Sequence, residues 1–382
     1  MTLELRLPGG VHRLRTPIAL SAPDRPITSR RVYAAAHVVA DPLGQNSPGA
    51  PAAVDWDATL AFRRHLWSLG LGVADAMDTA QRGMGLDWPA TRELITRSGA
   101  EARAVGGLLA CGVGTDHLAG ADHTLRDIIG AYREQLVVVE ESGAQPVLMA
   151  SRALSAAAKG PDDYLHVYGE VIDSAAQPVI LHWLGDMFDP ALVGYWGGAS
   201  LDDATDTVLD LIRENAPRVD GIKVSLLDAG REIELRRALP ESVRLYTGDD
   251  FNYPELVRGD EAGHSDALLG VFDPIAPVAA AALRALDADD IERYDALMTP
   301  TLPLARHLFA APTYHYKTGV VFLAWLAGHQ SHFTMVAGAQ SNRSVPHLTE
   351  LFRLADTAGI LPNPELAVHR MRQFLSLAGV EA

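Results

Sequence analysis

The feature that most constrains this chain is a regular alternation of short apolar runs with longer amphipathic segments. Eight apolar runs follow one another, and each has a segment of helical periodicity after it. The runs cover residues 32–39, 72–77, 105–113, 146–150, 178–184, 221–226, 243–247 and 267–272. The clearest helical segments cover residues 56–69, 88–97, 125–141, 161–175 and 201–215.

Apolar strands that alternate with helices predict an α/β protein whose parallel sheet is covered on both faces. Eight such units favour a closed (β/α)8 TIM barrel over an open sheet. An open, doubly wound sheet would want a glycine-rich phosphate-binding turn after its first strand. Asp41-Pro42-Leu43-Gly44-Gln45 does not supply that turn. Asp55 and Asp87 are the expected N-caps of the first two helices, and Pro89 suits a first helical turn.

An extension is predicted at each end of the barrel. Leu3-Glu4-Leu5-Arg6-Leu7 and residues 11–14 alternate in polarity around Pro8-Gly9-Gly10, which predicts a β-hairpin. We therefore assign residues 1–30 to an N-terminal hairpin extension, 31–275 to the barrel and 276–382 to a C-terminal helical bundle packed on it. Within this bundle, helices are expected at residues 279–286, 291–297, 318–328, 346–358 and 364–377.

Charge and cysteine content limit the possible binding partners and the cellular compartment. With 32 Lys and Arg against 48 Asp and Glu, the formal net charge is −16, which disfavours nucleic acid and anionic membrane as partners. The single cysteine, Cys111, excludes an internal disulfide and suits a reducing cytoplasm. The first residues lack a basic stretch before an apolar core, and no apolar run reaches about 18 residues. We expect a cytoplasmic protein without signal peptide or membrane span, acting on a small molecule.

Lys223 interrupts an otherwise apolar strand, Gly221-Ile222-Lys223-Val224. Lost hydration disfavours the ammonium form and lowers the pKa of a buried lysine. A neutral amine can attack a carbonyl and form a Schiff base. The alternative is that Lys223 lies at a strand end, with its amine in water or paired with a carboxylate.

In a barrel of this kind the active site lies where the strands end, so the polar residues at those ends are the candidates. They are Asp75, Asp78, Thr79, Gln81, Arg82, Cys111, Thr115, Ser151, Arg152, His182, Trp183, Ser225, Asp249, Asp250 and Asp273. Some have a structural alternative: Asp273 and Asp250 could cap the next helix, and Cys111 could be a small buried hydrophobe. His182 could equally be a ligand or a core histidine, and Arg152 could bind a substrate anion or a neighbouring loop.

The order of these motifs resembles the dihydrodipicolinate synthase / N-acetylneuraminate lyase family of class I aldolases. Gly221-Ile222-Lys223 followed by Ser225 is similar to its Schiff-base strand, and Thr247-Gly248-Asp249-Asp250 is similar to its Ser-Gly-Asp-Asp segment. Gly112-Val113-Gly114 resembles its third-strand turn, residues 86–94 its second helix, and Pro178 lies where its fifth strand begins. Tyr316-Lys317 resembles the start of one of its C-terminal helices.

The departures from this family are as informative as the matches. Its carboxylate-binding Gly-Thr-Thr-Gly-Glu is Asp78-Thr79-Ala80-Gln81-Arg82 here, so only Thr79 matches. Its proton-relay tyrosine falls at Ser151 or Arg152, and its Tyr-Asn-Val-Pro is His182-Trp183-Leu184-Gly185. The lysine is retained without its usual neighbours. This indicates a divergent branch, similar to the domain-of-unknown-function 993 (DUF993) subfamily, rather than an enzyme of lysine biosynthesis or sialic acid cleavage.

The resemblance implies a Schiff-base lyase or aldolase that acts on a small keto acid or sugar-derived carbonyl compound. Lys223 would be the nucleophile and His182 the acid/base, with no cofactor and no metal. Substrate-binding candidates are Asp78, Thr79, Gln81, Arg82, Ser151, Arg152, Trp183, Ser225, Asp249 and Asp250. The resemblance also implies a homo-oligomer, a dimer or tetramer.

Two alternatives remain open at this stage. Asp75, Asp78 and Asp249 with His182 could form the site of a metal-dependent barrel isomerase or hydrolase. His329 and His332, in the C-terminal helices, are expected to be structural. The second alternative is a non-catalytic relative that binds a ligand and keeps only the fold.

Overall fold

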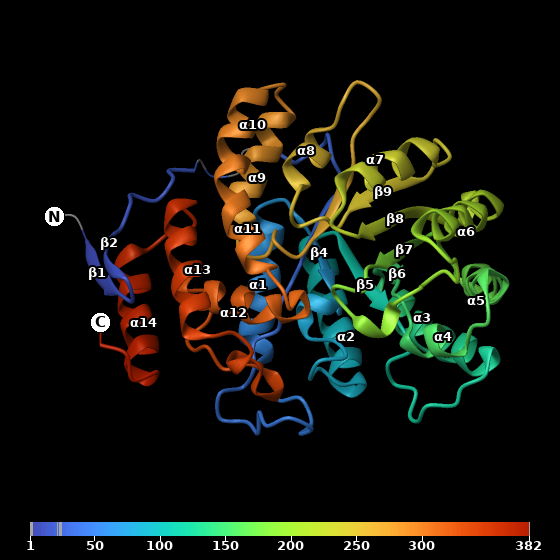
Figure 1. The fold of residues 1–382 in the computed structure, drawn as a ribbon, viewed down its shortest axis with the longest axis horizontal. Coiled ribbons are helices and arrows are strands. Elements are labelled where there is room, and N and C mark those ends of the chain that lie inside the picture. The colour runs from blue at the N-terminus through green and yellow to red at the C-terminus, as the bar shows by residue number, and fades with distance from the viewer. Residues whose placement is uncertain (1–2, 21, 23–24, 382) are drawn as a thin grey trace.

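The computed structural model describes residues 3–20, 22 and 25–381, and its centre is a closed barrel of eight parallel strands (Figure 1). The strands are β3 (Val32–Ala35), β4 (Gly72–Asp75), β5 (Leu109–Val113), β6 (Gln145–Leu148), β7 (Val179–Leu184), β8 (Val219–Ser225), β9 (Arg244–Thr247) and β10 (Asp266–Leu269). They pair in chain order, and β10 closes the barrel by pairing with β3. The predicted (β/α)8 TIM barrel is confirmed.

Helices follow the strands and cover the outside of the barrel. They are α1 (Trp56–Ser68), α2 (Trp88–Val105), α3 (Leu125–Ser142), α4 (Arg152–Ala157), α5 (Pro161–Ser174), α6 (Leu201–Glu214), α7 (Ala229–Ala238), α8 (Tyr253–Arg258) and α9 (Ala276–Leu286). Asp55 and Asp87 cap α1 and α2 as predicted, each accepting from a backbone N–H. The prediction was wrong at Val105, which ends α2 and does not begin a strand. Gly106, at φ 67°, terminates that helix.

Alternation along each strand separates an inner from an outer layer. On β7, Ile180 belongs to the inner cluster, whereas Val179, Leu181 and Trp183 pack in the outer layer under the helices. The inner cluster fills the barrel with Tyr33, Ala35, Ala74, Met77, Ala110, Val147, Met149, Ile180, Tyr246 and Leu268. The barrel interior is therefore a packed core below the C-terminal ends of the strands, the ends at which this architecture builds its active sites.

The residues after α9 are helical, as predicted. They form α10 (Ile291–Met298), α11 (Leu302–Leu308), α12 (Tyr316–Ala327), α13 (Val345–Thr357) and α14 (Pro364–Leu377). The prediction missed α11. The last three helices lie on one side of the barrel, where both chain ends are also found (Figure 1).

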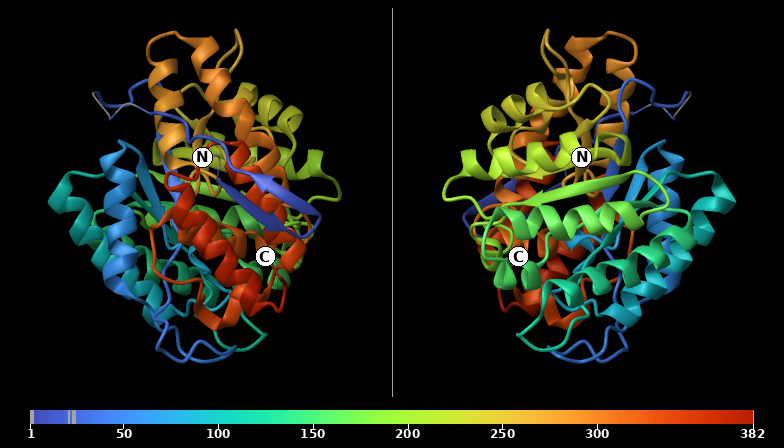
Figure 2. Two further views of the ribbon diagram at one scale, coloured as in Figure 1. Left: turned by 90° about the vertical axis from the view of Figure 1, so that its left-hand side faces the viewer. Right: turned by 90° about the vertical axis from the view of Figure 1, so that its right-hand side faces the viewer.

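The N-terminal hairpin packs on these last helices. Strands β1 (Glu4–Leu7) and β2 (Gly10–Arg13) pair as predicted, with Leu7 opposite Gly10. The His12 Nε2 lies 2.8 Å from Asp356 Oδ2 on α13, and Arg353 donates to the carbonyl of Pro8. Figure 2 shows the hairpin lying across the red helices. Residues 1–2, 21 and 23–24 of the predicted 1–30 extension lie outside the described residues.

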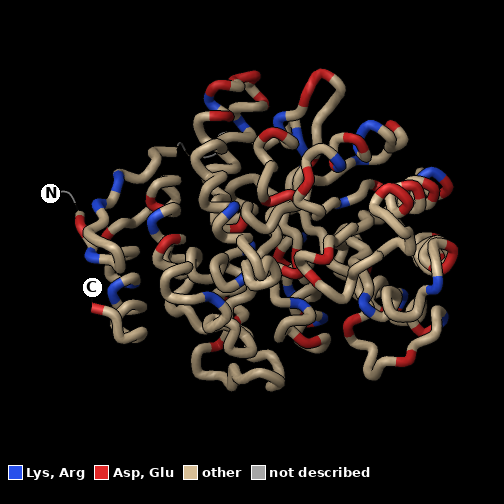
Figure 3. The backbone as a smooth tube through the Cα atoms, viewed as in Figure 1, with Lys and Arg blue, Asp and Glu red and all other residues tan. Residues whose placement is uncertain are grey.

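Acidic residues spread over the surface, and α6 carries several along its length (Figure 3). Among the described residues, no helix has the length and apolar character needed to cross a membrane.

Candidate active site

Lys223 points into the barrel from the C-terminal half of β8. Its neighbours Ile222 and Val224 point outward into the helix layer, and its own side chain is 8% exposed. Gly248, after β9, makes room for it, because a Cβ at that position would lie 2.8 Å from the Lys223 Cε. The strand placement predicted for Lys223 is confirmed, and the amine is not in open water.

Burial controls the charge of this amine. It lowers the pKa of Lys223 from its usual value, while the carboxylates of Asp78 and Asp250 act in the opposite direction. Asp250 is itself buried, which raises its pKa to about 7. Lys223 therefore reaches its neutral, nucleophilic form at a lower pH than a surface lysine does.

His182 is the hydrogen-bond partner of this amine. It lies opposite Lys223 in the register of β7 and β8, with Nε2 3.1 Å from the Lys223 Nζ and 3.4 Å from the Ser225 Oγ. Burial, together with the Lys223 charge, lowers the pKa of His182 well below its usual value. Its Nδ1 has no hydrogen-bond partner among the described residues. A neutral imidazole thus faces the amine as a proton acceptor.

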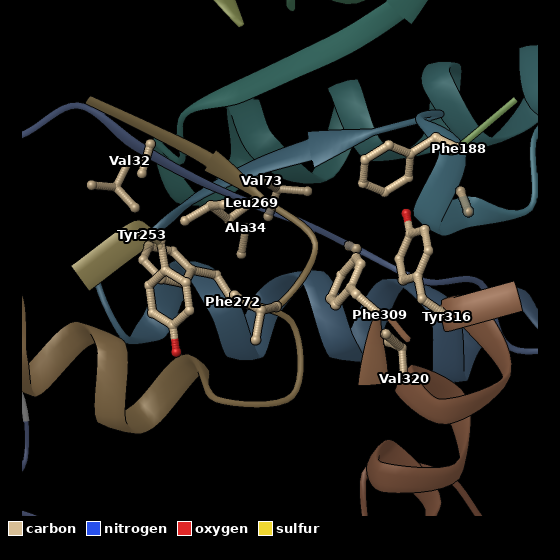
Figure 4. Close-up of a cluster of buried hydrophobic side chains, with 14 of the residues drawn as sticks. Val32, Ala34, Val73, Phe188, Tyr253, Leu269, Phe272, Phe309, Tyr316 and Val320 are labelled. Carbon is tan, nitrogen blue, oxygen red and sulfur yellow. The ribbon is translucent and has the colours of Figure 1, made fainter. Parts of the chain in front are cut away.

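A tyrosine that the sequence prediction missed enters the same pocket from the C-terminal extension. Tyr316, the first residue of α12, places its hydroxyl 2.7 Å from the Thr79 Oγ1. Its ring stacks on Phe309 at 4.4 Å and meets Phe188 edge-on (Figure 4). Burial raises the pKa of Tyr316 well above its usual value, so the phenol keeps its proton. The only sequence signal was Tyr316-Lys317 at a helix start.

Two cavities meet at this point. A small one of about 10 Å³, room for about one water molecule, holds the Lys223 amine. Its lining is Ala35, Met77, Asp78, Thr79, Leu184, Phe188, Lys223, Ser225, Asp250, Gly270 and Tyr316. A second cavity of about 460 Å³, over the ends of β4 to β7, is lined by residues that include Asp78, Arg82, Asp116, Arg152, Leu184 and Asp189. Asp78 and Leu184 line both.

The structure therefore brings several predicted substrate-binding residues to the site. Asp78, Thr79, Ser225 and Asp250 line the Lys223 pocket. Arg82 and Arg152 line the larger cavity, and both guanidinium groups already hold a carboxylate. Arg82 is 2.6 Å from Asp116, and Arg152 is 2.5 Å from Asp189 on the loop after β7.

Other predicted substrate-binding residues have structural partners instead. The Gln81 amide donates to the carbonyl of Val336, and Ser151 caps α4 and contacts the Thr115 hydroxyl at 2.6 Å. Asp249 accepts from Asn252 and from the backbone of its own turn. Trp183 packs in the outer layer, 6.4 Å from the ring of Trp196. These four line neither cavity.

The predicted helix caps at Asp273 and Asp250 were wrong. Asp273 lies 2.7 Å from the Nδ1 of His37 and accepts from the backbone N–H of the same residue. Asp250 accepts from the N–H of Val271 and so joins the ends of β9 and β10. Cys111 is a fully buried strand residue, and burial raises the pKa of its thiol well above the usual value.

The carboxylates of the metal alternative do not assemble. Asp75 points outward and is paired with Arg63 at 2.8 Å, in a completely buried contact, and Asp249 is held in its turn. In the part of the chain that the structure describes, no group of three or more His, Cys, Asp and Glu side chains could hold a metal ion.

A second buried lysine lies beside the site. Lys317, next to Tyr316, donates to the carbonyl of Tyr314 at 3.1 Å, and burial lowers its pKa to about 8. The chain has only three lysines, Lys159, Lys223 and Lys317. Two of the three are therefore buried at this end of the barrel.

Comparison with known proteins identifies a family and solved structures of the same fold. The family model described as "Protein of unknown function (DUF993)" matches residues 9–380, and no curated protein matches the sequence. Solved dihydrodipicolinate synthases share the fold. The enzyme from Acinetobacter baumannii, complexed with pyruvate, is 17% identical with a TM-score of 0.62, over 86% of this chain and 99% of that one.

Two further synthases share the fold. The synthase from Thermotoga maritima is 12% identical with a TM-score of 0.63, over 87% of this chain and all of its own. The synthase from Aquifex aeolicus is 14% identical with a TM-score of 0.58, over 91% and 98% of the two chains. At these identities the likeness establishes the fold, and the family match covers nearly the whole sequence. The chain belongs to the DUF993 family, and its barrel has the same fold as the dihydrodipicolinate synthases.

Proposed function

We propose that this protein is a Schiff-base-forming lyase or aldolase that acts on a small keto acid or sugar-derived carbonyl compound, with Lys223 as the nucleophile. The observation that carries the proposal is the buried Lys223 amine at the C-terminal end of the barrel, 3.1 Å from the imidazole of His182. Its pKa is lowered by burial, which favours the neutral amine that attack on a carbonyl requires.

The neighbouring groups divide the proton transfers between them. When Lys223 attacks the carbonyl carbon, its nitrogen must lose a proton, and the neutral His182 Nε2 is positioned to accept it. The carbonyl oxygen must gain protons and leave as water. Tyr316 supplies a protonated hydroxyl in the same pocket, oriented by Thr79. Two groups whose pKa values are driven in opposite directions thus serve as acceptor and donor.

The test is chemical trapping of the intermediate. Wild-type protein is incubated with cyanoborohydride and one carbonyl compound at a time, and its intact mass is measured. The compounds are pyruvate, 2-oxobutyrate, hydroxyacetone and dihydroxyacetone. We expect a single addition with at least one of these compounds, and peptide mapping is expected to place it on Lys223. Because only three lysines exist, the assignment is unambiguous.

The control variants use the other two lysines. Lys159→Arg and Lys317→Met should keep the addition, whereas Lys223→Ala should lose it together with any turnover. The proposal fails if no compound adds to the wild type. It also fails if the addition maps to Lys317, or if Lys223→Ala retains turnover.

A further inference from the structure

The carboxylate of Asp78 occupies the junction between the Lys223 pocket and the larger cavity. It lies in the turn Asp78–Ala80 directly after β4, and its side chain lines both spaces. Leu184 is the other residue that they share, so Asp78 provides the charged group at the boundary. A substrate bound to Lys223 must pass this carboxylate to extend into the larger cavity.

Asp78 differs from the other carboxylates of the site in its contacts: its charge acts on the Lys223 amine, but no hydrogen-bond donor among the described residues holds it. Asp116 is held by Arg82, Asp189 by Arg152, and Asp250 by the N–H of Val271. Among the described residues, none donates a hydrogen bond to the side chain of Asp78. A half-buried carboxylate without such a donor can accept a proton from a bound molecule without first breaking a contact.

The larger cavity has the size of a small-molecule site and a nearly balanced charge. Its volume of about 460 Å³ lies within the ordinary range for ligand pockets, roughly 300 to 1,000 Å³. Arg82 and Arg152 face three carboxylates, Asp78, Asp116 and Asp189, and each arginine is already paired. The remaining polar atoms of the lining suit the hydroxyl groups of a ligand. An anionic group bound in this cavity would be repelled by the unpaired negative charge.

From these observations we infer that Asp78 is the catalytic base for carbon–carbon bond cleavage, and that the larger cavity binds the aldehyde half of a polyhydroxylated β-hydroxycarbonyl substrate. The inference rests on the proposed Schiff base at Lys223. The carbonyl carbon is bonded to Lys223 in the small pocket, and the hydroxyl-bearing carbon two bonds away reaches the junction.

The cleavage step balances within the site. Asp78 takes the proton of the β-hydroxyl group, and the O–H electron pair becomes the second bond of the aldehyde carbonyl. The bond between the α and β carbons breaks, and its electron pair moves into the iminium to give a neutral enamine on Lys223. The aldehyde leaves through the larger cavity. The proton on Asp78 then returns to the α carbon, and water releases the remaining ketone from Lys223.

The experiment separates adduct formation from bond cleavage. Wild-type, Asp78→Asn and Asp186→Asn proteins are treated with pyruvate and cyanoborohydride to measure the adduct, and separate, untreated samples are assayed for aldehyde release from 2-keto-3-deoxy pentonates and hexonates of each configuration. Asp186 is the matched control, because it is an exposed aspartate on the loop after β7 that lines neither cavity. We expect Asp78→Asn to keep its pyruvate adduct on Lys223 and to lose cleavage by about 100-fold or more. Asp186→Asn should match the wild type.

Two further measurements sharpen the result. Formate should restore part of the cleavage lost in Asp78→Ala, because a small carboxylate can occupy the vacated position. Wild-type cleavage of 4-hydroxy-2-oxoglutarate, whose aldehyde half is anionic, should be at least about tenfold slower than that of the best hydroxylated compound.

Each failure has a distinct meaning. An Asp78→Asn variant that cleaves within threefold of wild type overturns the base assignment, as does one that loses adduct and cleavage equally. A wild type that forms the pyruvate adduct but cleaves no hydroxylated compound overturns the substrate class and leaves the Schiff base standing. A wild type that adds no carbonyl compound overturns the proposed function and this inference with it.

Discussion

The amine of Lys223 and the Nε2 of His182 lie 3.1 Å apart, at the same register on the neighbouring strands β8 and β7. Both side chains are buried, and burial favours the neutral form of each. When the neutral amine attacks a carbonyl its nitrogen becomes positively charged, and its proton can then move to the neutral imidazole without separating unlike charges in a dry pocket, because a single positive charge is transferred. This relationship is the reason to treat His182 as part of the reaction.

His182→Leu should therefore slow adduct formation while leaving Lys223 in place. We expect the rate of pyruvate trapping by cyanoborohydride to fall by about 100-fold or more, the usual contribution of a positioned acid/base group. His329→Leu is the control, because His329 is a half-buried histidine with a pKa lowered by burial and lines neither cavity. Equal trapping rates in wild type and His182→Leu would show that the imidazole is only a packing group.

The pH dependence of trapping should report the charge of Asp250. Its carboxylate stabilises the ammonium form of Lys223 and so raises the pKa of the amine against the effect of burial. Asp250→Asn removes that stabilisation, which lowers the pKa and moves the midpoint of trapping to lower pH. Asp186→Asn, an exposed change on the loop after β7 that lines neither cavity, should leave the midpoint unchanged. Trapping rates at a series of pH values test both, and an upward shift in Asp250→Asn contradicts the assignment.

Tyr316→Phe should distinguish the contribution of the Tyr316 hydroxyl to adduct formation from the packing contribution of its ring. The ring packs between Phe309 and Phe188 and is retained, so the fold should survive (Figure 4). The bond to Thr79 and the proton donor are lost, and we expect adduct formation to fall by roughly 100-fold. Tyr294→Phe removes another buried hydroxyl, bonded to the carbonyl of Pro254 outside the site, and should not slow trapping. A slow Tyr294→Phe variant would mean that any lost tyrosine hydroxyl has this effect.

The fold was predictable from sequence because each barrel strand is buried on both faces and therefore appears as a nearly continuous apolar run. The meeting of Lys223 with His182 followed from the same fact, since consecutive strands of such a barrel are neighbours. The position of Tyr316 in the Lys223 pocket was not predictable. It depends on how α12 packs over the barrel end, a contact between segments far apart in the chain that no local pattern encodes.

The strand-end residues were only partly predictable for a different reason. Alternation assigns sides within a strand, but the chain leaves regular geometry where the strand stops. After β4 the backbone takes a positive φ of 52° at Ala76 and again of 62° at Gln81. Asp75, the last residue of β4, still follows the alternation and faces outward to Arg63, whereas Asp78 comes after the positive φ of Ala76 and faces the site. The sequence separation of such residues does not reveal which way each one points.

Asp75 should be essential for stability and dispensable for chemistry. Its carboxylate holds Arg63 through two contacts of 2.8 and 3.1 Å and accepts from Ser98 at 2.6 Å. Asp75→Ala leaves a buried guanidinium unpaired, which costs about 3–5 kcal/mol of unfolding free energy. The double variant Arg63→Met, Asp75→Leu should recover most of that loss. Urea denaturation measures both, and a single-variant loss below about 1 kcal/mol would contradict this account.

Glu232 gives a stability prediction whose sign is fixed by its pKa. Its side chain is buried, accepting from Thr247 at the end of β9 at 2.9 Å and from Ser265 at 2.7 Å. Burial raises its pKa from 4.5 to about 8. Between those pH values the folded protein holds a proton that the unfolded chain has lost, so unfolding free energy falls as pH rises. At pH 7 the accumulated cost is about 3 kcal/mol, from about 1.4 kcal/mol per pH unit.

Glu232→Gln removes this ionisation and keeps groups that can bond both hydroxyls. The variant should therefore be more stable than wild type at pH 7 and similar to it at pH 4.5, with the gap widening steadily between the two. Glu234→Gln, an exposed change two residues along α7, should follow the wild-type curve throughout. Urea denaturation across this pH range tests the prediction. Parallel curves for wild type and Glu232→Gln would mean that Glu232 is ionised in the folded protein, because only a proton held in the folded state makes the gap grow with pH.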